Sequence, residues 1–301
     1  MAKTKTKIRE PRCDRVMHAI TSTVLMFVLI IVGYPVLYVV SSSFSSTNAL
    51  NEGRVLLWPV EFSLSSYEFV FRYEQVWIGY RNTIFYTIGC TVVTLFLTVT
   101  MAYPLSKKYY QGRKFVTSLI IVAMLTSSGL IPVFMLKKSL GMVNSVTAII
   151  LSGALSFRSV IVLRTAFQTG IPGELFDAAR IDGANDFPCL TQIALPLSKA
   201  TLSVVSLWVM VGAWNEYFNA MIYLHDRNMW PLQLFLREIL TAGQNIDAST
   251  VSGTDMLALM DNGTAGIKYA LIVISTVPML ILYNVLQKFF KKGVMVGSMK
   301  G

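Results

Sequence analysis

Few side chains in this sequence are of the kinds that enzymes use for catalysis. The 301 residues include 2 His and 3 Cys. Cys13, Cys90 and Cys189 lack metal-ligand spacing, and we interpret them as inert structural thiols. The sequence contains neither a Gly-x-x-x-x-Gly-Lys-Ser/Thr phosphate loop nor a Gly-x-Gly-x-x-Gly fingerprint. We therefore expect no catalytic residue, cofactor or metal in this chain, and an energy source in another protein.

Two charged residues stand inside segments that are otherwise apolar, Arg158 and Glu216. A charge in a bilayer is costly and usually faces a cavity or a partner. Aromatic faces and bidentate polar groups bind sugars, and a guanidinium pairs with the carboxylate of an acidic sugar. A structural ion pair or snorkelling side chains remain the alternative. The candidate substrate path consists of Arg158, Trp214, Asn215, Glu216, Tyr217 and Asn219.

The composition indicates a membrane protein that carries these residues. Hydrophobic residues make up 54% of the chain and charged residues 14%, whereas soluble domains average about 25% charged residues. The net charge is +10, but the basic residues flank apolar segments and form no stripe interleaved with aromatics. This distribution argues against nucleic-acid binding.

Six segments have the length and apolar character of membrane-spanning helices. A bilayer core needs roughly 20 apolar residues of helix, and such continuous runs exclude a β-barrel. The first run is too long for a signal peptide, so we expect it to remain as an anchor. The predicted spans are 16–41, 82–106, 115–136, 143–167, 200–224 and 266–287.

Most Lys and Arg residues fall on one side of these spans. By the positive-inside rule that side is the cytosol, and both termini are predicted to lie there. Two external loops follow, 42–81 and 225–265; the second is rich in Asn, Asp, Thr and Gly and is expected to be solvated or to serve as a docking surface. The predicted organisation is a basic cytosolic tail (1–15), a first helix with its external loop (16–81), a core of five helices (82–290) and a cytosolic tail (291–301).

The cytosolic segment between the fourth and fifth spans, 170–199, has an ordered pattern. Pro172 followed by Glu174 and Asp177 marks a helix start, because proline suits the first turn and acidic side chains favour the positive end of the helix dipole. Gly183 is placed to end the helix in the left-handed conformation. A second short helix is expected to stop at Pro196 and to carry on one side Phe187, Leu190, Ile193 and Leu195.

This segment resembles the EAA loop of importer permeases in the ATP-binding-cassette (ABC) superfamily. The matching residues are Asp177-Ala178-Ala179, Asp182-Gly183-Ala184 and Ile193-Ala194-Leu195-Pro196, with Asp177 in place of the usual Glu. The resemblance implies that the first short helix seats in a cleft of a separate ATPase. The residues assigned to that contact are Glu174, Asp177, Ala178, Ala179, Arg180, Asp182, Gly183 and Ala184.

Three further segments resemble the carbohydrate-uptake branch, and in particular the second permease of maltose-type importers. They are 129–132, 214–217 and the C-terminal run 287–301. The resemblance implies an all-α integral membrane fold of six transmembrane helices, the type I importer (MetI-like) permease fold, in a bacterial cell membrane. It is closest to the sub-branch for complex oligosaccharides or modified glycans.

The partners follow from the same resemblance. They are a second permease, two ATPase subunits that bind ATP and Mg, an extracytoplasmic solute-binding protein and a sugar. Loop 225–265 is the segment expected to touch the binding protein. Two other classes of protein fit the sequence less well. An ion-gradient-driven secondary transporter usually has more spans and internal repeats, and an intramembrane enzyme needs catalytic pairs that are missing here.

Overall fold

The computed structural model describes residues 12–126, 128–242 and 264–297, and these residues form helices and connecting turns with no β-strand. The chain divides into two compact units. One comprises residues 1–70 and 247–273, and the other comprises residues 71–246 and 274–301. The acidic residues Asp247, Asp255 and Asp261 of the second predicted external loop lie outside the described residues.

The first unit contains a long apolar helix and the connection that follows it. Its elements are α1 (Arg12–Ser43), α2 (Thr47–Asn51), most of α3 (Ser65–Arg72) and the beginning of α16 (Thr264–Gly297). The connection is ordered by aromatic stacking, since the ring of Phe44 lies 5.0 Å from that of Tyr67 and 5.8 Å from that of Phe62. Tyr67 also donates a hydrogen bond of 2.8 Å from its hydroxyl to Ser43 Oγ. The loop predicted at 42–81 is therefore a folded segment with short helices.

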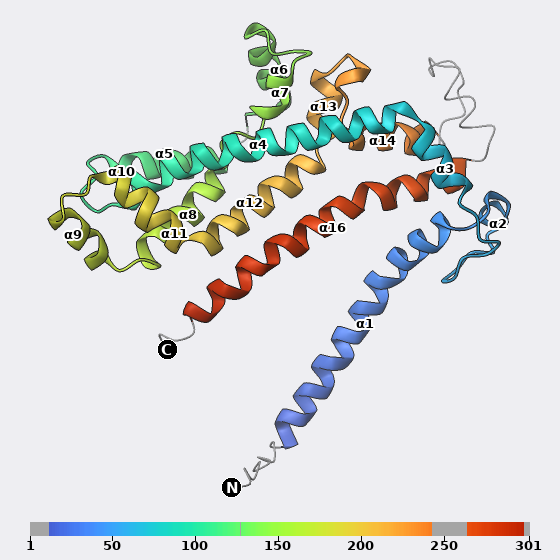
Figure 1. Cartoon of the computed structure of the whole chain (residues 1–301), viewed down its shortest axis with the longest axis horizontal. Coiled ribbons are helices and arrows are strands. Elements are labelled where there is room, and N and C mark those ends of the chain that lie inside the picture. Colours follow the sequence, from blue (N-terminus) through green and yellow to red (C-terminus); the bar gives the residue numbers. More distant parts are fainter. Residues whose placement is uncertain (1–11, 127, 243–263, 298–301) are drawn as a thin grey trace. The chain divides into compact units, whose positions relative to one another are not determined.

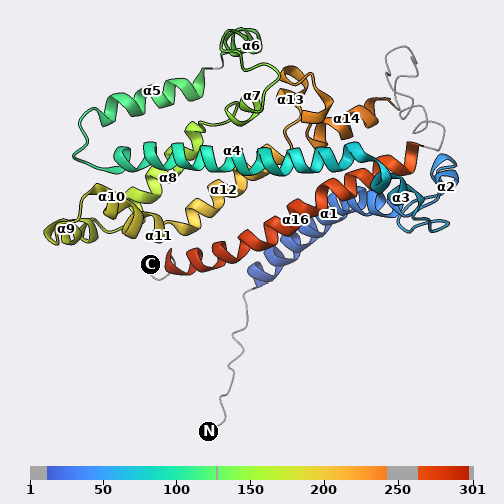
Figure 2. The ribbon, with the colours of Figure 1, turned by 45° about the horizontal axis from the view of Figure 1, so that its top comes forward.

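The second unit holds the remaining elements. They are α4 (Glu74–Ser106), α5 (Arg113–Leu125), α6 (Leu130–Ser139), α7 (Val146–Ile150), α8 (Phe157–Thr169), α9 (Gly173–Ile181), α10 (Asp186–Pro188), the π-helix η1 (Cys189–Ala194), α11 (Leu195–Leu197), α12 (Lys199–Trp214), α13 (Phe218–Tyr223), the 3-10 turn η2 (Arg227–Met229), α14 (Leu232–Ala242) and the rest of α16. Helices α8, α12 and α14 pack along α4, which is the central helix of this unit (Figures 1 and 2).

One face of α4 is built from small polar residues, which allow close helix packing in a membrane protein. Buried threonines recur every three or four residues along this face, at Thr83, Thr87, Thr91, Thr94 and Thr98. Close packing leaves backbone groups within reach of these side chains. The backbone N–H of Leu232 in α14 donates to Thr83 Oγ1 at 2.8 Å, and Thr94 Oγ1 donates to the carbonyl oxygen of Gly153 at 3.2 Å.

The first, second and sixth predicted spans appear as continuous helices. These are α1, α4, which begins eight residues before the predicted span at 82, and α16, which continues to Gly297. The predicted C-terminal tail 291–301 is therefore helical as far as Gly297. In the described part of the chain, three helices are long and apolar enough to cross a membrane, or up to five if each sharply bent pair is one span. The predicted count of six is not reached by this measure.

The other three predicted spans are broken. The segment 115–136 forms α5 and α6, which meet at 114° and are joined through Gly129 at φ +72°. The segment 143–167 forms α7 and α8, which are separated by the non-helical residues 151–156. The turn before α7 is at Asn144, which adopts φ +57° and whose side-chain oxygen accepts backbone hydrogen bonds from His225 at 3.0 Å and Asp226 at 3.1 Å. The segment 200–224 forms α12 and α13, with a break after Trp214.

The second external loop was expected to be solvated or to serve as a docking surface, and its described first part, 225–242, packs against α4. The hydroxyl of Tyr86 donates to the Met229 carbonyl at 2.8 Å, and the Asn82 amide donates to the carbonyls of Asn228 and Trp230 at 2.7 and 3.1 Å. Helix α14 buries apolar side chains including Leu232, Leu234, Phe235 and Ile239. The polar average over 225–265 conceals this short apolar helix.

Candidate functional site

The short helix of the predicted coupling segment has well-defined ends. Helix α9 begins after Pro172, with Glu174 in its first turn. It ends at a Schellman motif, in which the N–H of Gly183 donates to the carbonyl of Arg180 at 3.0 Å and the N–H of Ala184 donates to that of Ala179 at 2.8 Å. Gly183 has φ +82°, the left-handed conformation that the sequence predicted for it.

The second half of the segment differs from the expected single helix. It consists of α10, the π-helix η1 and α11, and Pro196 lies within α11 rather than at a helix stop. Pro196 occupies the first turn of α11, where the backbone N–H that proline lacks has no partner within the helix. The chain bends by 80° at Ser198 and enters α12. The predicted stop is therefore two residues early.

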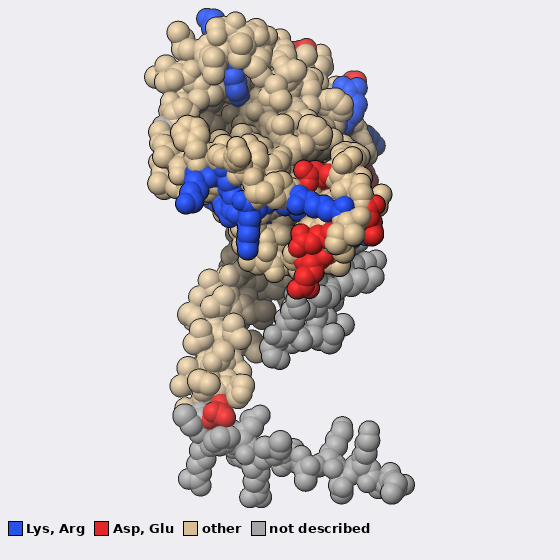
Figure 3. Space-filling model, turned by 90° about the vertical axis from the view of Figure 1, so that its left-hand side faces the viewer, with Lys and Arg blue, Asp and Glu red and all other residues tan. Residues whose placement is uncertain are grey.

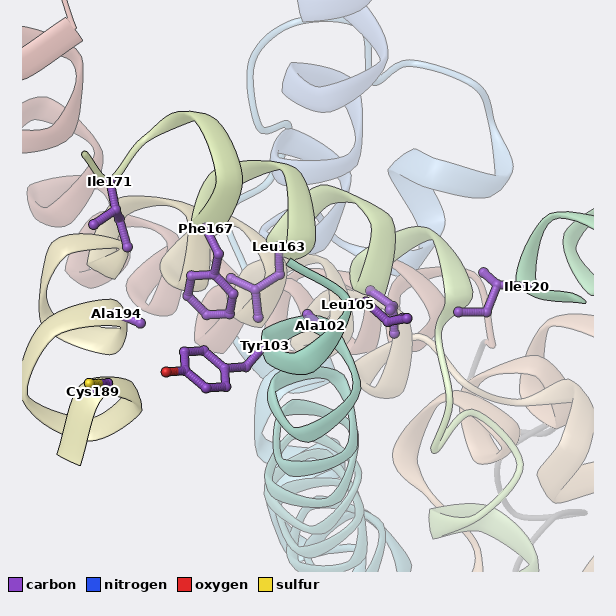
Figure 4. Packing of buried hydrophobic residues seen from close by; sticks show 10 residues of the cluster. Ala102, Tyr103, Leu105, Ile120, Leu163, Phe167, Ile171, Cys189 and Ala194 are labelled. Atoms are coloured by element: carbon purple, nitrogen blue, oxygen red, sulfur yellow. The ribbon is translucent and has the colours of Figure 1, made fainter. Parts of the chain in front are cut away.

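An apolar cluster attaches this segment to the long helices. Tyr103 of α4, Phe167 of α8 and Cys189 of η1 are buried together (Figure 4). The Tyr103 and Phe167 rings meet edge to face with centroids 6.1 Å apart, a favourable arrangement for an aromatic pair. From the coupling segment, partly buried side chains pack against the cluster, among them Phe176, Ala179, Ala184, Leu190, Ile193 and Leu195. Phe187 was predicted to share this side but is 74% exposed.

A lysine at the end of α4 extends this anchor. Lys107 is buried, and its Nζ lies 3.0 Å from the centroid of the Phe176 ring and 4.6 Å from that of Tyr103. These contacts are cation–π interactions between α4 and α9. Burial disfavours the charged amine and lowers the pKa of Lys107 to about 8.

A second set of contacts joins the α4–α5 connection to the turn after α9. The hydroxyl of Tyr109 donates to Asp186 Oδ1 at 2.7 Å, and Arg180 Nη2 lies 3.4 Å from the same oxygen. The Arg180 guanidinium also lies over the Tyr109 ring, 4.3 Å from its centroid. Arg180 was assigned to the ATPase contact, and its contacts here are within the chain. Together with Lys107, these residues fix α9 and the turn that follows it.

The outer face of the segment is apolar with acidic side chains beside it. Ile181 is 87% exposed, Phe187 74% and Leu175 44%. Six of the eight predicted contact residues are also exposed, namely Glu174, Asp177, Ala178, Arg180, Asp182 and Gly183. Figure 3 shows acidic side chains gathered beside a band of basic ones at this end of the second unit. The sequence analysis did not assign Leu175 and Ile181 to this exposed face. The feature that could have revealed them is the presence of apolar residues on both sides of so short a helix.

A separate cavity of about 670 Å³ lies among α4, α5, α8 and α12. Arg158 in the first turn of α8 and Glu216 just after α12 both line it. The remaining polar and aromatic lining includes Thr94, Ser152, Ser156, Ser159 and Trp208. The break between α7 and α8 borders this cavity, as expected for irregular backbone in a membrane protein.

The two charges in this cavity have different roles. Glu216 accepts hydrogen bonds from the backbone N–H of Asn219 at 2.8 Å and from its amide at 2.9 Å, so it caps the start of α13. Arg158 is exposed and makes no ion pair or hydrogen bond with any residue in the described ranges. The structural Arg158–Glu216 pair that was left open is not formed, and Arg158 is available to an anionic ligand.

The four other residues of the predicted path do not line this cavity, and Asn219 is the one bound by Glu216. Trp214 is buried, and its indole N–H donates to the Ser275 carbonyl at 2.9 Å. Asn215 donates its amide to the Val211 carbonyl at 2.9 Å. The guanidinium of Arg237 lies over the ring of Tyr217, with Cζ 5.1 Å from the ring centroid. These residues are adjacent to Glu216 in sequence but do not share its cavity, because α12 ends at Trp214 and the chain changes direction there. Ser152, Ser156 and Trp208 were not predicted, since nothing in their local sequence distinguishes them.

Comparison with known proteins finds relatives in sequence and in fold. No family model matches the chain. Protein LplC of Bacillus subtilis (strain 168) is 38% identical over 89% of this chain and 89% of its own length. The polygalacturonan/rhamnogalacturonan transport system permease protein YtcP of the same organism is 36% identical over 92% of this chain and 95% of its own. A subunit of a bacterial ABC transporter involved in the import of the acidic polysaccharide alginate superimposes with a TM-score of 0.84 at 33% identity, covering 94% of this chain and 99% of that one.

The relatives and the structural neighbour place this helical fold in the class of transport permeases. The chain belongs to the family of permease subunits of ABC importers, in the branch that takes up sugars and oligosaccharides. It is a multi-pass membrane protein and a transport component rather than an enzyme.

Proposed function

We propose that this chain and a second permease form the path for a sugar in a bacterial cell membrane, and that a separate ATPase drives the path through α9. The observation that carries this proposal is the combination of a fixed helix with an open apolar face. Lys107 and Tyr109 attach the α9 region to the α4 end, while Ile181 remains 87% exposed. A side chain so exposed at the tip of a rigid element is suited to a partner's cleft.

The mechanical role of the segment follows from this attachment. Two ATPase subunits would bind ATP and Mg and close on each other, moving the cleft in which α9 sits. Because α9 is joined to α4 and α8 through Tyr103 and Phe167, a displacement of α9 is passed to helices that line the 670 Å³ cavity. Asp177 keeps the negative charge of the usual Glu, but its side chain is shorter by one methylene group.

The test of this coupling is substitution of the exposed apolar tip. Ile181→Ser removes contact area without touching the Schellman motif, and we expect the ATPase to be lost from the purified complex and ATP-driven uptake to fall at least tenfold. Leu56→Ser removes a 62% exposed leucine in the first unit and serves as the matched control. Undiminished co-purification and uptake with Ile181→Ser would contradict the assignment of α9.

We infer further that the sugar is acidic. Arg158 faces the cavity with no partner among the described residues, and a guanidinium binds a carboxylate bidentately. The names of the relatives agree in part, since one structural neighbour belongs to an importer of an acidic polysaccharide. Arg158→Ala is expected to reduce uptake of an acidic oligosaccharide at least tenfold more than uptake of a neutral one. An equal reduction of both would refute the carboxylate role.

The proposed partners and topology complete this function. An extracytoplasmic solute-binding protein would deliver the sugar to the outer side, where segment 225–265 is the expected contact. Both termini would lie in the cytosol. The large share of Lys and Arg on the flanks next to the α9 side supports this orientation, and family membership favours an ABC importer over an ion-gradient-driven transporter.

A further inference from the structure

A second cavity with a strongly basic lining lies at the start of α5. It has a volume of about 870 Å³ and is bordered by the α4–α5 connection, the first turns of α5 and the middle of α8. Four cations line it, Lys108, Arg113, Lys114 and Arg164, and its lining contains no Asp or Glu. Its lining shares no residue with the 670 Å³ cavity and includes none from α9, although Lys108 and Arg113 also line an adjoining cavity that reaches Asp177.

These four cations lack anionic partners. The ion pairs among the described residues involve Arg54, Arg180 and Arg227, and none of the four cations takes part in one. Arg164 donates a hydrogen bond from Nε to the Leu105 carbonyl at 3.1 Å, which holds this guanidinium in place beside the cavity. A cluster of like charges around a cavity is relieved by binding an anion, and phosphate is the anion that Arg and Lys together bind well.

An exposed apolar face begins at the same cavity. Phe115 lines the cavity and is 68% exposed, and Leu119 and Val122 follow at 52% and 59% exposure. Positions i, i+4 and i+7 lie on one side of a helix, so the three side chains form a continuous stripe along α5. A basic pocket at one end of an apolar stripe matches a phosphate headgroup with acyl chains below it.

We propose that this cavity binds the headgroup of an anionic phospholipid, whose acyl chains lie along the Phe115–Val122 face of α5. The phosphate contacts Arg113, Lys114 and Arg164, and Lys108 closes the rim. A free phosphate ion offers the same charge but would not use the apolar stripe. An acidic protein surface would need the stripe to be covered by apolar side chains of a partner. Continuity of the basic pocket with a helix face of a membrane protein favours the lipid.

The test uses the complete importer, purified with its partner subunits and placed in nanodiscs of phosphatidylglycerol and phosphatidylcholine. Retained lipids are counted by native mass spectrometry. Each basic residue near an anionic lipid surface contributes about a fivefold change in affinity, so Arg113→Gln with Lys114→Gln is expected to weaken phosphatidylglycerol retention by about 30-fold. Phosphatidylcholine retention should not change.

Two controls keep the result interpretable. Arg72→Gln with Lys138→Gln removes one Arg and one Lys that do not line the cavity, and this pair is expected to retain phosphatidylglycerol. The exchanged pair Arg113→Lys with Lys114→Arg keeps both charges and should also retain phosphatidylglycerol. This control distinguishes an effect of lost charge from an effect of substitution on folding.

Three outcomes would overturn the proposal. One is equal phosphatidylglycerol retention by the neutralised variant and the wild type. Another is complete release of the lipid by excess inorganic phosphate at unchanged ionic strength, which would identify a site for free phosphate. The third is loss of the ATPase from the neutralised variant with phosphatidylglycerol still bound, which would identify a protein contact.

Discussion

At the scale of single residues, Gly183 determines how α9 ends. Its backbone has φ +82°, and a Cβ built at this position meets no atom within 4 Å. The requirement for glycine is therefore conformational rather than steric. A residue with a Cβ pays a strain of about 1 kcal/mol or more in this backbone region.

Gly183→Ala is expected to raise the population of the opened α9 turn about fivefold, which corresponds to about 1 kcal/mol. Hydrogen exchange of the α9 amides measures this opening, and sugar-stimulated ATP hydrolysis should fall with it.

Gly141 provides a matched control for Gly183. It ends α6 in the same motif, with φ +67° and no atom within 4 Å of a built Cβ. Gly141→Ala therefore carries the same backbone strain outside the coupling segment, and ATP hydrolysis should remain near the wild-type rate. Equal losses of hydrolysis in both variants would show that general destabilisation explains the effect of Gly183→Ala.

Lys107 gives the chain a pH dependence with a defined sign. Its pKa is lowered by burial from 10.5 to about 8, so between these values the unfolded chain holds a proton that the folded chain has released. The free energy of unfolding is therefore expected to rise as the pH increases from about 8 to about 10.5. The same deprotonation weakens the cation–π contact with Phe176, so α9 is held less firmly at the higher pH.

The measurement is the unfolding midpoint of the purified protein across this pH range. Lys107→Met should remove most of the rise, whereas Lys108→Met, at an exposed neighbour, should keep it. A rise that persists unchanged in Lys107→Met would show that another group is responsible.

At the scale of elements, the threonine face of α4 determines how α14 is held. Thr83 is buried and accepts the backbone N–H of Leu232 at 2.8 Å. Thr83→Val keeps the shape of the side chain but leaves a buried N–H without a partner, and we expect a loss of about 1–3 kcal/mol in the free energy of unfolding.

Thr87 is the natural control, because it lies one turn further along the same face. Its Oγ1 is buried and has no hydrogen-bond partner among the described residues. Thr87→Val is therefore expected to leave the free energy of unfolding unchanged or to increase it slightly. Denaturant titration of both variants tests the pair, and equal destabilisation would argue against the role of the Leu232 hydrogen bond.

The elements that sequence reasoning predicted well are those with local signals. Uninterrupted apolar runs gave α1, α4 and α16, and Pro172 with Gly183 gave both ends of α9. Broken helices were missed, because an apolar run has the same composition whether it is straight or bent. The turn at Asn144, which precedes α7, likewise depends on hydrogen bonds from His225 and Asp226, some 80 residues away in sequence.

The candidate site shows the same limit. The position of the coupling helix was predictable from its start and stop residues. The exposed face of this helix was not predictable, because it depends on the packing of Phe176 against Lys107 and the Tyr103–Phe167 cluster. For this reason Ala179 and Ala184 were assigned to a partner contact but pack inward. Ile181, which is 87% exposed, was overlooked.

At the scale of the whole molecule, the chain supplies the transport path while a separate protein is proposed to supply the energy. The chain belongs to a family of ABC importer permeases, and it supplies a cavity with an unpaired Arg158 and a rigid helix with an exposed apolar tip. The proposed energy source is the ATPase that engages this helix. A transporter driven by an ion gradient would need no such external partner.

The most direct test reconstitutes the chain in liposomes with its second permease, its ATPase and its solute-binding protein, and measures sugar uptake with and without ATP. We predict that uptake requires hydrolysable ATP on the side of the membrane where α9 lies. We also predict that omitting the ATPase abolishes uptake, even under a proton or sodium gradient. Uptake by this chain without the ATPase, driven by either gradient, would contradict the account.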